Sequence, residues 1–540
     1  MSDGDPTLWR FHGGLKLSGH KSESTSLAVI EPPLPQRLIL PLQQHIGRPA
    51  EPCVSIGTRV MKGQLLAAAD GYVSASVHAP TSGLVEAIES RPIPHPSGLT
   101  APCIVLRSDG EDQWIDDLPD QDSEPLDAIA LRHRVRAAGI VGLGGAAFPA
   151  SVKLNPGPER KLDQLILNGA ECEPYISCDD MLMRERAADI LSGAGLLCRA
   201  LGVARCLFGI EDNKPEALAA LEAALAASPN PGVELRRVPT IYPTGGEKQL
   251  IRVLTGKEVP AHGIPAEIGM VCHNVGTALA VHEAVILGRP LISRYITVTG
   301  QGVTTPRNLE VRFGTPVSEL VEACGGYTER ADRLIMGGPM MGFALATDEV
   351  PVVKGSNCIL VASNQELSQP GPVMPCIRCG ACTEVCPVGL LPQQLYWYAR
   401  ARDFDKVQDY SVFDCIECGC CVTVCPSRIP LVQYYRYAKT AIWAQEREKE
   451  KADLARQRHQ FRLERLEREK NERAARMSKK RAALETTDTG TDSKKAAIEA
   501  ALARARAKKA DARPDRSSTP APKSAKIPET VEDRPPAEKP

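Results

Sequence analysis

The spacing of apolar residues changes along the chain, and each change marks a different kind of structure. Between residues 38 and 115, short apolar runs alternate closely with glycine and proline turns, a pattern typical of a small all-β domain. Residues 125–292 alternate strand-like runs with stretches of helical periodicity, which favours an α/β sheet. Residues 293–350 return to β-branched runs around one short helix and predict a β-grasp module.

The α/β segment carries four loops that are candidates for ligand binding. Strand-like runs near residues 165, 238 and 270 each end in a polar loop with glycine, and helices are expected at 128–138, 215–227, 247–254 and 277–287. Ligands of such sheets bind at the carboxyl ends of the strands. The fourth loop, residues 139–149, is rich in glycine but follows a helix, whereas a Rossmann fingerprint follows a strand. A phosphate-binding loop and an ordinary glycine-rich turn both remain open, and the neighbouring loops favour the former.

The two ends of the chain are polar. Residues 1–37 form an N-terminal extension that contains Phe11-His-Gly-Gly-Leu15. Residues 441–513 are rich in Glu, Lys, Arg, Ala and Gln, which predicts a long solvated helix. Residues 514–540 are rich in Pro, Ser, Lys and Glu and are expected to be a disordered tail.

Length and charge limit the functional classes. With 540 residues, the chain is too long to fold around a single hydrophobic core, and its length suggests three or four domains. A formal net charge of -1 provides no basic field for nucleic acid or a membrane surface. The chain has neither a run of eighteen apolar residues, as a membrane span requires, nor a secretory signal. Any membrane contact is therefore expected to be peripheral, through partners.

Two cysteine motifs carry the strongest chemical signal. The spacing C-x2-C-x2-C-x3-C-P occurs at residues 376–387 and again at 415–426. In bacterial ferredoxins with this spacing, three close thiolates hold one [4Fe-4S] cluster and the fourth serves the other cluster. We therefore expect a two-cluster ferredoxin domain at residues 366–440. The first cluster is assigned to Cys376, Cys379, Cys382 and Cys425, and the second to Cys415, Cys418, Cys421 and Cys386.

Structural zinc and disulfides are the alternatives, because C-x2-C pairs also suit zinc. Eight cysteines in two copies, each closed by a proline, fit these alternatives badly. Cys420 lies off the spacing and is interpreted as a packed thiol. The ten cysteines outside the motif spacing show no disulfide framework, which, with oxygen-sensitive clusters, indicates a reducing compartment.

Three resemblances to known families extend this interpretation. Residues 38–115, in which segments 54–67 and 73–88 echo each other, resemble a lipoyl or biotinyl-type β-hybrid domain. Met61-Lys62 lacks the hairpin context of a modified lysine, so a scaffold role is expected. The four loops resemble the flavin- and NADH-binding subunit of respiratory complex I and of NAD-linked hydrogenases. The order of parts over residues 8–440 resembles the C subunit of the ion-translocating Rnf (Rsx) electron transport complex.

The resemblance implies a multidomain α/β plus β fold. Its parts are a lipoyl-like β-hybrid domain, a Rossmann-like flavin/NADH domain at 125–292, an SLBB-like β-grasp module, a two-cluster ferredoxin domain, a charged helix and a disordered tail. It also implies non-covalent FMN, with NADH as substrate and no catalytic side chain. The cofactor-binding residues that it carries over are Gly142, Gly144, Gly145, Phe148, Lys153, Asn168, Glu171, Glu173, Tyr242, Gly245, Glu247, Asn274 and Thr277.

Three residues depart from the pattern of the complex I subunit: Leu143 stands in place of an arginine, Ala170 of an aspartate and Gly246 of a glutamate. These departures concern the contacts expected with the nicotinamide. The predicted function is a peripheral electron-input subunit on the cytoplasmic face of the bacterial inner membrane. It would couple electron transfer between NADH and ferredoxin-type partners, through FMN and two [4Fe-4S] clusters, to ion translocation by other subunits of the complex. A soluble NADH diaphorase or hydrogenase subunit and a non-enzymatic iron–sulfur adaptor are the alternatives.

Overall fold

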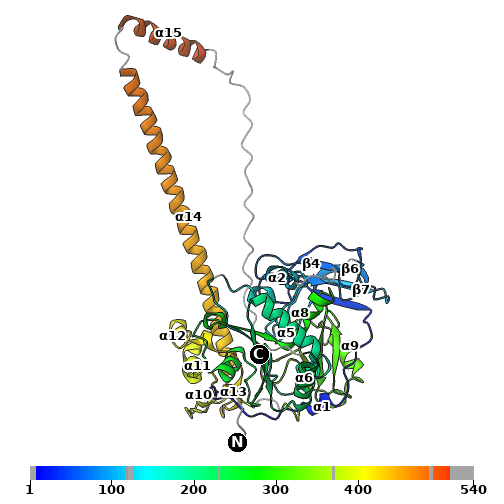
Figure 1. The fold of residues 1–540 in the computed structure, drawn as a ribbon. Helices are drawn as coiled ribbons and strands as arrows, with labels where there is room; N and C mark the ends of the chain where they lie inside the picture. Colours follow the sequence, from blue (N-terminus) through cyan, green and yellow to red (C-terminus); the bar gives the residue numbers. More distant parts are fainter. Residues whose placement is uncertain are drawn as a thin grey trace, which may run out of the picture. The chain divides into compact units, whose positions relative to one another are not determined.

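The structure is a computed structural model that describes residues 8–116, 118, 126–157, 159–228, 232–367, 371–485 and 491–510. The chain divides into two compact units, Met1–Ala444 and Gln445–Pro540, whose elements are drawn in Figure 1. The tail predicted at residues 514–540 lies outside the described residues.

From residue 8 on, the first unit contains an extended segment followed by a small all-β domain. A single helical turn, α1 (Ser22–Thr25), interrupts the segment. Two antiparallel sheets then share a core that includes the fully buried Leu40, Val60 and Leu66. The first sheet has the order β1 (Arg37–Pro41), β7 (Thr100–Ser108), β6 (Gly83–Pro92) and β3 (Arg59–Val60), and the second β2 (Glu51–Pro52), β4 (Leu65–Ala68) and β5 (Val77–His78). Two small packed sheets agree with the predicted β-hybrid domain.

A four-stranded parallel sheet follows. Its order is β10 (Val233–Val238), β9 (Arg205–Glu211), β8 (Gln164–Gly169) and β11 (Met270–Asn274). The central strand β9 was not predicted, and the apolar run after residue 238 is a loop instead of a strand. Because all four strands run in the same direction, the loops that follow them gather at one edge of the sheet.

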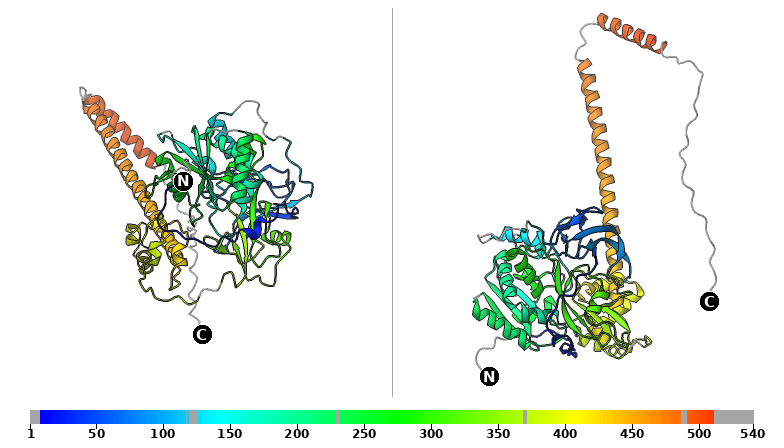
Figure 2. Two further views of the ribbon diagram at one scale, coloured as in Figure 1. Left: turned by 60° about the horizontal axis from the view of Figure 1, so that its bottom comes forward. Right: turned by 90° about the vertical axis from the view of Figure 1, so that its right-hand side faces the viewer.

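Helices cover both faces of this sheet, as Figure 2 shows from two further sides. Buried residues of α7 pack against Ile166 and Leu207 on one face, whereas those of α5 and α8 pack against Leu165 and Phe208 on the other. The helices and helical turns of this domain are α2 (Ala128–Ala137), α3 (Ala150–Lys153), α4 (Cys178–Glu185), α5 (Ala187–Leu201), α6 (Pro215–Ala227), α7 (Glu247–Thr255), the 3-10 turn η1 (Pro265–Ile268) and α8 (Val275–Ile286).

The β-grasp module is a five-stranded mixed sheet with one helix, α9 (Val317–Ala323). Its strand order is β13 (Arg307–Arg312), β12 (Ser293–Thr299), β16 (Cys358–Ala362), β14 (Arg333–Met336) and β15 (Phe343–Ala344). The middle strand β16 lies beyond residue 350, at which the predicted module ends. Its pairing with β12 and β14 makes it part of the same sheet.

The ferredoxin domain is built from short helices around its own apolar core, which includes Leu395, Val407 and Tyr435. Its elements are α10 (Ala381–Glu384), α11 (Pro392–Ala401), α12 (Phe404–Asp409), the 3-10 turn η2 (Val412–Asp414), α13 (Cys420–Thr423) and the start of α14 (Leu431–Glu485). α10 and α13 occupy equivalent places in the two cysteine motifs. Each follows a glycine with positive φ, Gly380 at +84° and Gly419 at +78°, a backbone conformation that glycine adopts without strain.

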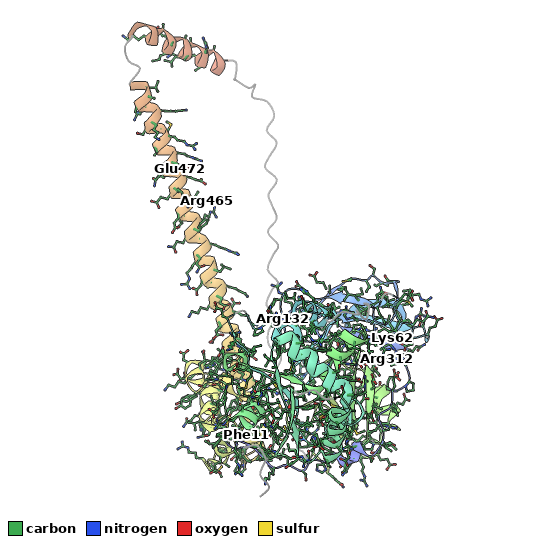
Figure 3. All side chains as sticks on the ribbon, in the orientation of Figure 1. Phe11, Lys62, Arg132, Arg312, Arg465 and Glu472 are labelled. Atoms are coloured by element: carbon green, nitrogen blue, oxygen red, sulfur yellow. The ribbon has the colours of Figure 1, made fainter. Side chains whose placement is uncertain are left out.

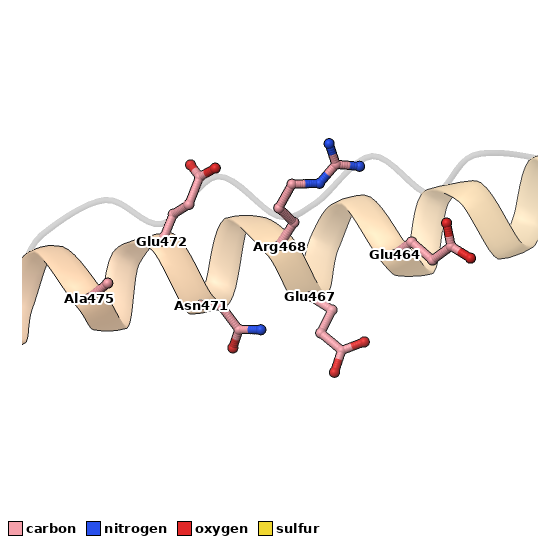
Figure 4. Close-up of a pocket in the computed structure, with 6 residues that line it drawn as sticks. All are labelled: Glu464, Glu467, Arg468, Asn471, Glu472 and Ala475. Carbon is pink, nitrogen blue, oxygen red and sulfur yellow. The ribbon is translucent and has the colours of Figure 1, made fainter.

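The second unit contains the rest of α14 and α15 (Thr491–Ala510). The described side chains of α14 in this unit are mostly exposed, including Phe461 at 62%, and Figure 3 labels Arg465 and Glu472 among them. A shallow hollow on α14 is lined by residues of this one helix only, and their side chains point to different sides of it (Figure 4). This matches the predicted solvated helix and provides no enclosed site. None of the described helices is long and apolar enough to cross a membrane.

We expect Gly193→Ala to destabilise the α/β domain. Alanine normally favours a helix over glycine by about 1 kcal/mol, but here an added Cβ would lie 1.9 Å from the carbonyl oxygen of Ala278 on α8. Overpacking of this kind costs about 1–3 kcal/mol, so the clash outweighs the gain in propensity. Thermal unfolding followed by circular dichroism measures the effect, and an unchanged or raised midpoint would contradict this account of the α5–α8 contact.

Candidate functional site

The four predicted loops meet at the carboxyl edge of the parallel sheet. The Leu143 N–H donates to Thr277 Oγ1 at 3.0 Å, which joins the glycine-rich loop to the start of α8. The Asn168 Nδ2 donates to the Gly245 carbonyl at 2.9 Å and joins the loops that follow β8 and β10. Lys153 follows the glycine-rich loop, Glu247 follows the loop after β10, and their side chains form an ion pair. Residues far apart in the sequence thus line one site.

The glycine-rich loop keeps one side open. Gly145 has φ +109°, and no atom lies within 4 Å of the place where a Cβ would stand. Gly144 lies directly beside Asn274: a Cβ atom added to Gly144 would lie 3.4 Å from the Cβ of Asn274. Gly142 and Phe148 pair through a 2.8 Å backbone hydrogen bond that closes the loop. An open, glycine-lined backbone of this kind suits a phosphate or a flanking ring.

Lys153 and Glu247 are partly exposed charges of the site. Their side chains are 31% and 34% exposed, and the Lys153 ammonium also donates to the Cys272 carbonyl at 3.1 Å. Burial lowers the pKa of Lys153, but the charge and the hydrogen bond of Glu247, together with Cys272, more than offset burial, so the pKa is raised. The ammonium therefore stays charged at neutral pH. It lies next to the Glu247 carboxylate and the Cys272 carbonyl, where a polar ligand can also bind.

Glu171 lies on the inner side of its loop and is buried. Its carboxylate accepts hydrogen bonds from the Asp179 N–H at 2.8 Å and from the Cys178 thiol at 3.4 Å, so it caps the start of α4. Asn274 Nδ2 donates to the Asp179 carboxylate at 2.7 Å, while Asn274 Oδ1 accepts from the Gly276 N–H at the start of α8. Burial and the charge of Glu171 raise the pKa of Asp179 to about 7.

Glu173 connects its loop to the β-grasp module. Its carboxylate accepts from the N–H groups of Met340 and Met341 at 3.0 and 2.8 Å. Burial raises the pKa of this carboxyl, and the two N–H bonds oppose that shift. The sequence analysis assigned no role at the site to Met340, Met341 or Asp179. No local sequence pattern indicates these contacts, because the partners are far apart along the chain. Asn274 and Asp179 are 95 residues apart, and Glu173 and Met340 are 167 residues apart.

Tyr242, in the loop after β10, contacts the ferredoxin domain. It is 2% exposed, and its hydroxyl donates to the Cys418 carbonyl at 2.6 Å. Tyr242, Cys418 and Cys420 form a small buried cluster against Cys172 and Met340. The loop after β10 therefore contacts the ferredoxin domain, next to the second cysteine motif.

The eight motif cysteines gather in two groups of four. Each group contains three thiols from one motif and the last thiol of the other motif. Cys376, Cys379, Cys382 and Cys425 line one cavity of about 300 Å³ together with Trp397 and Gln393. Cys386, Cys415, Cys418 and Cys421 line a second, smaller cavity with Cys420 and Tyr435. All 18 cysteines are described, and none forms a disulfide.

The donor chemistry of both cavities fits [4Fe-4S] clusters, because each offers four free thiols from a ferredoxin spacing. The environments of the two groups differ. Cys379 of the first group is exposed, whereas Cys386, Cys418 and Cys421 of the second are buried. Cys420 is fully buried and has the same cavity beside it, so packing accounts for its position.

Four family models match the chain in the predicted order. Residues 9–111 match the RnfC barrel sandwich hybrid domain, 135–283 the Nuo51 FMN-binding domain, 295–344 the SLBB domain, and 375–429 the 4Fe-4S dicluster domain. These matches confirm the classes of domain and the predicted cofactor types, FMN and [4Fe-4S] clusters.

Curated relatives, each named as the C subunit of an ion-translocating oxidoreductase complex, match over most of the chain. The protein of Pseudomonas aeruginosa is 52% identical over 468 residues, 87% of this chain and 60% of its own length. The protein of Serratia proteamaculans is 46% identical, and the match covers 93% of this chain and 70% of that protein. The protein of Rhodobacter capsulatus is 48% identical, and the match covers 73% of this chain and 75% of that protein. The chain belongs to this family of C subunits.

This family membership confirms the resemblance to the C subunit of Rnf complexes. The chain spans 60% of the length of its Pseudomonas aeruginosa relative. Among solved structures, it is similar to a chain of an NAD+-reducing [NiFe]-hydrogenase in the H2-reduced state, with a TM-score of 0.43 and 20% identity over 61% of this chain and 64% of that chain.

The two neighbouring thiols Cys420 and Cys421 provide a matched test of the cysteine groups. We expect Cys421→Ala to lose one cluster, about half of the iron and sulfide, and Cys420→Ala to keep both. Anaerobic iron and sulfide analysis, with EPR of the reduced protein, distinguishes the two variants. Loss of a cluster in Cys420→Ala but not in Cys421→Ala would contradict the grouping.

Asp179 predicts a pH dependence of stability. Its folded pKa of about 7 exceeds the ordinary 3.8, so between these values the folded state holds a proton that the unfolded state has lost. Stability from this group therefore falls as pH rises through this window. Relative to Asp179→Asn, the wild-type chain should become progressively less stable from pH 5 to pH 7, with no further change above pH 8.

Urea unfolding midpoints of both chains at each pH measure this difference. Asp70→Asn, at an exposed ion pair with Arg48, is the control for loss of a surface carboxylate. A pH profile for Asp179→Asn that parallels the wild type would show that Asp179 does not titrate in this range.

Proposed function

We propose that this chain is the peripheral electron-input subunit of an ion-translocating oxidoreductase complex, where it exchanges electrons between NADH and one-electron partners. The observation that carries the proposal is the junction at which the loop after β10 meets the second cysteine group, through Tyr242 and the Cys418 carbonyl. A two-electron cofactor domain and a one-electron domain are thereby packed together within one compact unit.

The proposed cofactors supply chemistry that side chains lack. FMN, when bound, accepts two electrons as a hydride and releases them singly, and each [4Fe-4S] cluster carries one electron. The chain itself binds and orients these groups. The first cysteine group would hold one cluster and the second the other, with the ligand sets assigned from the motif spacing.

The residues proposed to hold FMN divide into two kinds. The backbone of Gly142, Gly144 and Gly145, the start of α8 at Asn274 and Thr277, and the partly exposed pair Lys153–Glu247 are proposed to contact the ligand. Gly145 supports this proposal, because it has open space beside it. Asn168, Gly245, Glu171 and Glu173 instead hold the loops in place through internal hydrogen bonds. No side chain is required as nucleophile or general base.

The positions of the two cysteine groups support an electron path with an inner and an outer end. The second group lies against the FMN domain and is largely buried, whereas the first reaches the surface at Cys379. The partners proposed for the outer end are other subunits of the complex or a ferredoxin-type carrier, at the cytoplasmic face of the bacterial inner membrane. NADH is the proposed substrate at the FMN domain.

Anaerobic titration of the purified chain with NADH tests this function. We expect stoichiometric FMN, two clusters by iron and sulfide analysis, bleaching of the flavin absorbance by NADH, and EPR signals from two interacting clusters. The Cys421→Ala chain, which lacks a ligand of the inner group, is the comparison. Its remaining cluster should be reduced by NADH more slowly than either cluster of the wild type.

Clusters without FMN, unreduced by NADH, would contradict the proposal and indicate an electron-transfer adaptor. NADH oxidation by a protein that stays out of the membrane fraction, in cells that contain all subunits of the complex, would indicate a soluble diaphorase instead.

A further inference from the structure

The N-terminal segment with the sequence Phe11-His-Gly-Gly-Leu15 has no role in the function argued so far. It runs beside the ferredoxin domain (Figure 2), and Figure 3 labels Phe11 there. The Gly14 N–H donates to the Val385 carbonyl at 3.0 Å. The His12 imidazole donates from Nδ1 to the Cys386 carbonyl at 2.9 Å. Two residues of the segment therefore bind the backbone at a cysteine of the second group.

The glycines of this segment are required by close approach. Gly13 has φ +66°, and an added Cβ would lie 2.5 Å from the Val385 carbonyl carbon. Gly14 has φ +82°, and its added Cβ would lie 2.8 Å from the Tyr242 carbonyl oxygen. Contacts below 3.0 Å with backbone atoms cannot be relieved by rotating a side chain. The segment thus passes between two backbones, with no space for a larger residue.

The same segment pairs with Tyr242. Leu15 N–H donates to the Tyr242 carbonyl at 2.7 Å, and Tyr242 N–H donates back to the Leu15 carbonyl at 2.8 Å. The Tyr242 hydroxyl then reaches the Cys418 carbonyl. The segment and Tyr242 together bind the backbone of Cys386 from the first motif and of Cys418 from the second. Both cysteines line the same cavity.

Other contacts from outside the ferredoxin domain reach residues next to cysteines of the second group. The His262 N–H donates at 3.2 Å to Asp414, the residue before Cys415, and Gly419 lies against the Met340 carbonyl. Within the part of the chain that the structure describes, no hydrogen bond from residues 8–367 reaches the cysteines of the first group. The attachment is therefore one-sided.

We propose that His12–Leu15 and Tyr242 form a positioning clamp, which fixes the second cysteine group against the loops of the FMN domain. The inference rests on the proposed function and adds the residues that set the spacing between its two redox domains. His12 and Tyr242 are positioning residues, because they bind the carbonyls of two cysteines and not the sulfurs. Loss of the Tyr242 hydroxyl would leave the buried Cys418 carbonyl unpaired, and loss of His12 would leave the Cys386 carbonyl with only the Gly389 N–H at 3.2 Å. Either loss would let these cysteines shift.

Three variants, each with a matched control, test the clamp. His12→Ala removes the donor, and His12→Gln retains one as the conservative rescue. Gly13→Ala introduces the clash, and Gly98→Ala is its control, because Gly98 has φ +65° with nothing within 4 Å of an added Cβ. Tyr242→Phe removes one hydroxyl, and Tyr295→Phe removes another, which donates from the β-grasp module to Glu185 at 3.1 Å.

Two readouts that do not use NADH report on the clamp. The first is the reduction potential of each cluster, from EPR of samples titrated with dithionite and mediators. The second is the rate of iron release to a ferrous chelator. In the three test variants we expect one of the two clusters to change potential and to lose iron roughly 2- to 10-fold faster, the range that a lost hydrogen bond allows. The other cluster and all three controls should match the wild type.

Unchanged potentials and release rates in His12→Ala and Tyr242→Phe would overturn the clamp, even if Gly13→Ala does not fold. Equal changes in both clusters would also overturn it, because they would indicate general loosening. Failure of the proposed function is a separate result, since it appears in the wild-type chain as missing FMN or as clusters that NADH does not reduce.

Discussion

The hydrogen bond between the Tyr242 hydroxyl and the Cys418 carbonyl joins the two chemical halves of the molecule. Both groups are removed from water, since Tyr242 is 2% and Cys418 7% exposed. An unpaired hydroxyl or carbonyl at such a place costs about 1–3 kcal/mol. The bond is therefore satisfied only when the ferredoxin domain lies against the loop after β10, and this links the position of one domain to the conformation of the other.

A buried lysine performs the same task where the β-grasp module meets the β-hybrid and α/β domains. Lys354, which is 1% exposed, donates to the Ser76 carbonyl of the β-hybrid domain and to the Gly139 carbonyl of the α/β domain, both at 2.6 Å. Burial lowers the pKa of Lys354 to about 7. Such a cation is tolerated only with its hydrogen-bonding partners in place. The domain junctions thus depend on directional polar contacts, which specify orientation more narrowly than an apolar patch.

Sequence reasoning succeeded where the signal is local. The cysteine spacing predicted which thiols share a cavity, and the helix predicted at residues 215–227 is α6 (Pro215–Ala227). It missed β9, although six of its seven residues are buried, because a short apolar run between two helices has no period of its own. By resemblance it placed Tyr242 among the cofactor-binding residues, and that role stays a prediction. Its contact with Cys418, 176 residues away, leaves no trace in local sequence.

The two cysteine motifs show this limit most clearly. Their spacing is the same, and each ends in a proline, so neither copy by itself indicates an inner or an outer position. The difference arises from what packs against them: Gly14, His12 and Tyr242 bind the second group, whereas Cys379 of the first group stays exposed. Solvent access and hydrogen bonding are among the factors that set cluster potentials. Two nearly identical local sequences therefore acquire different redox environments from tertiary structure alone.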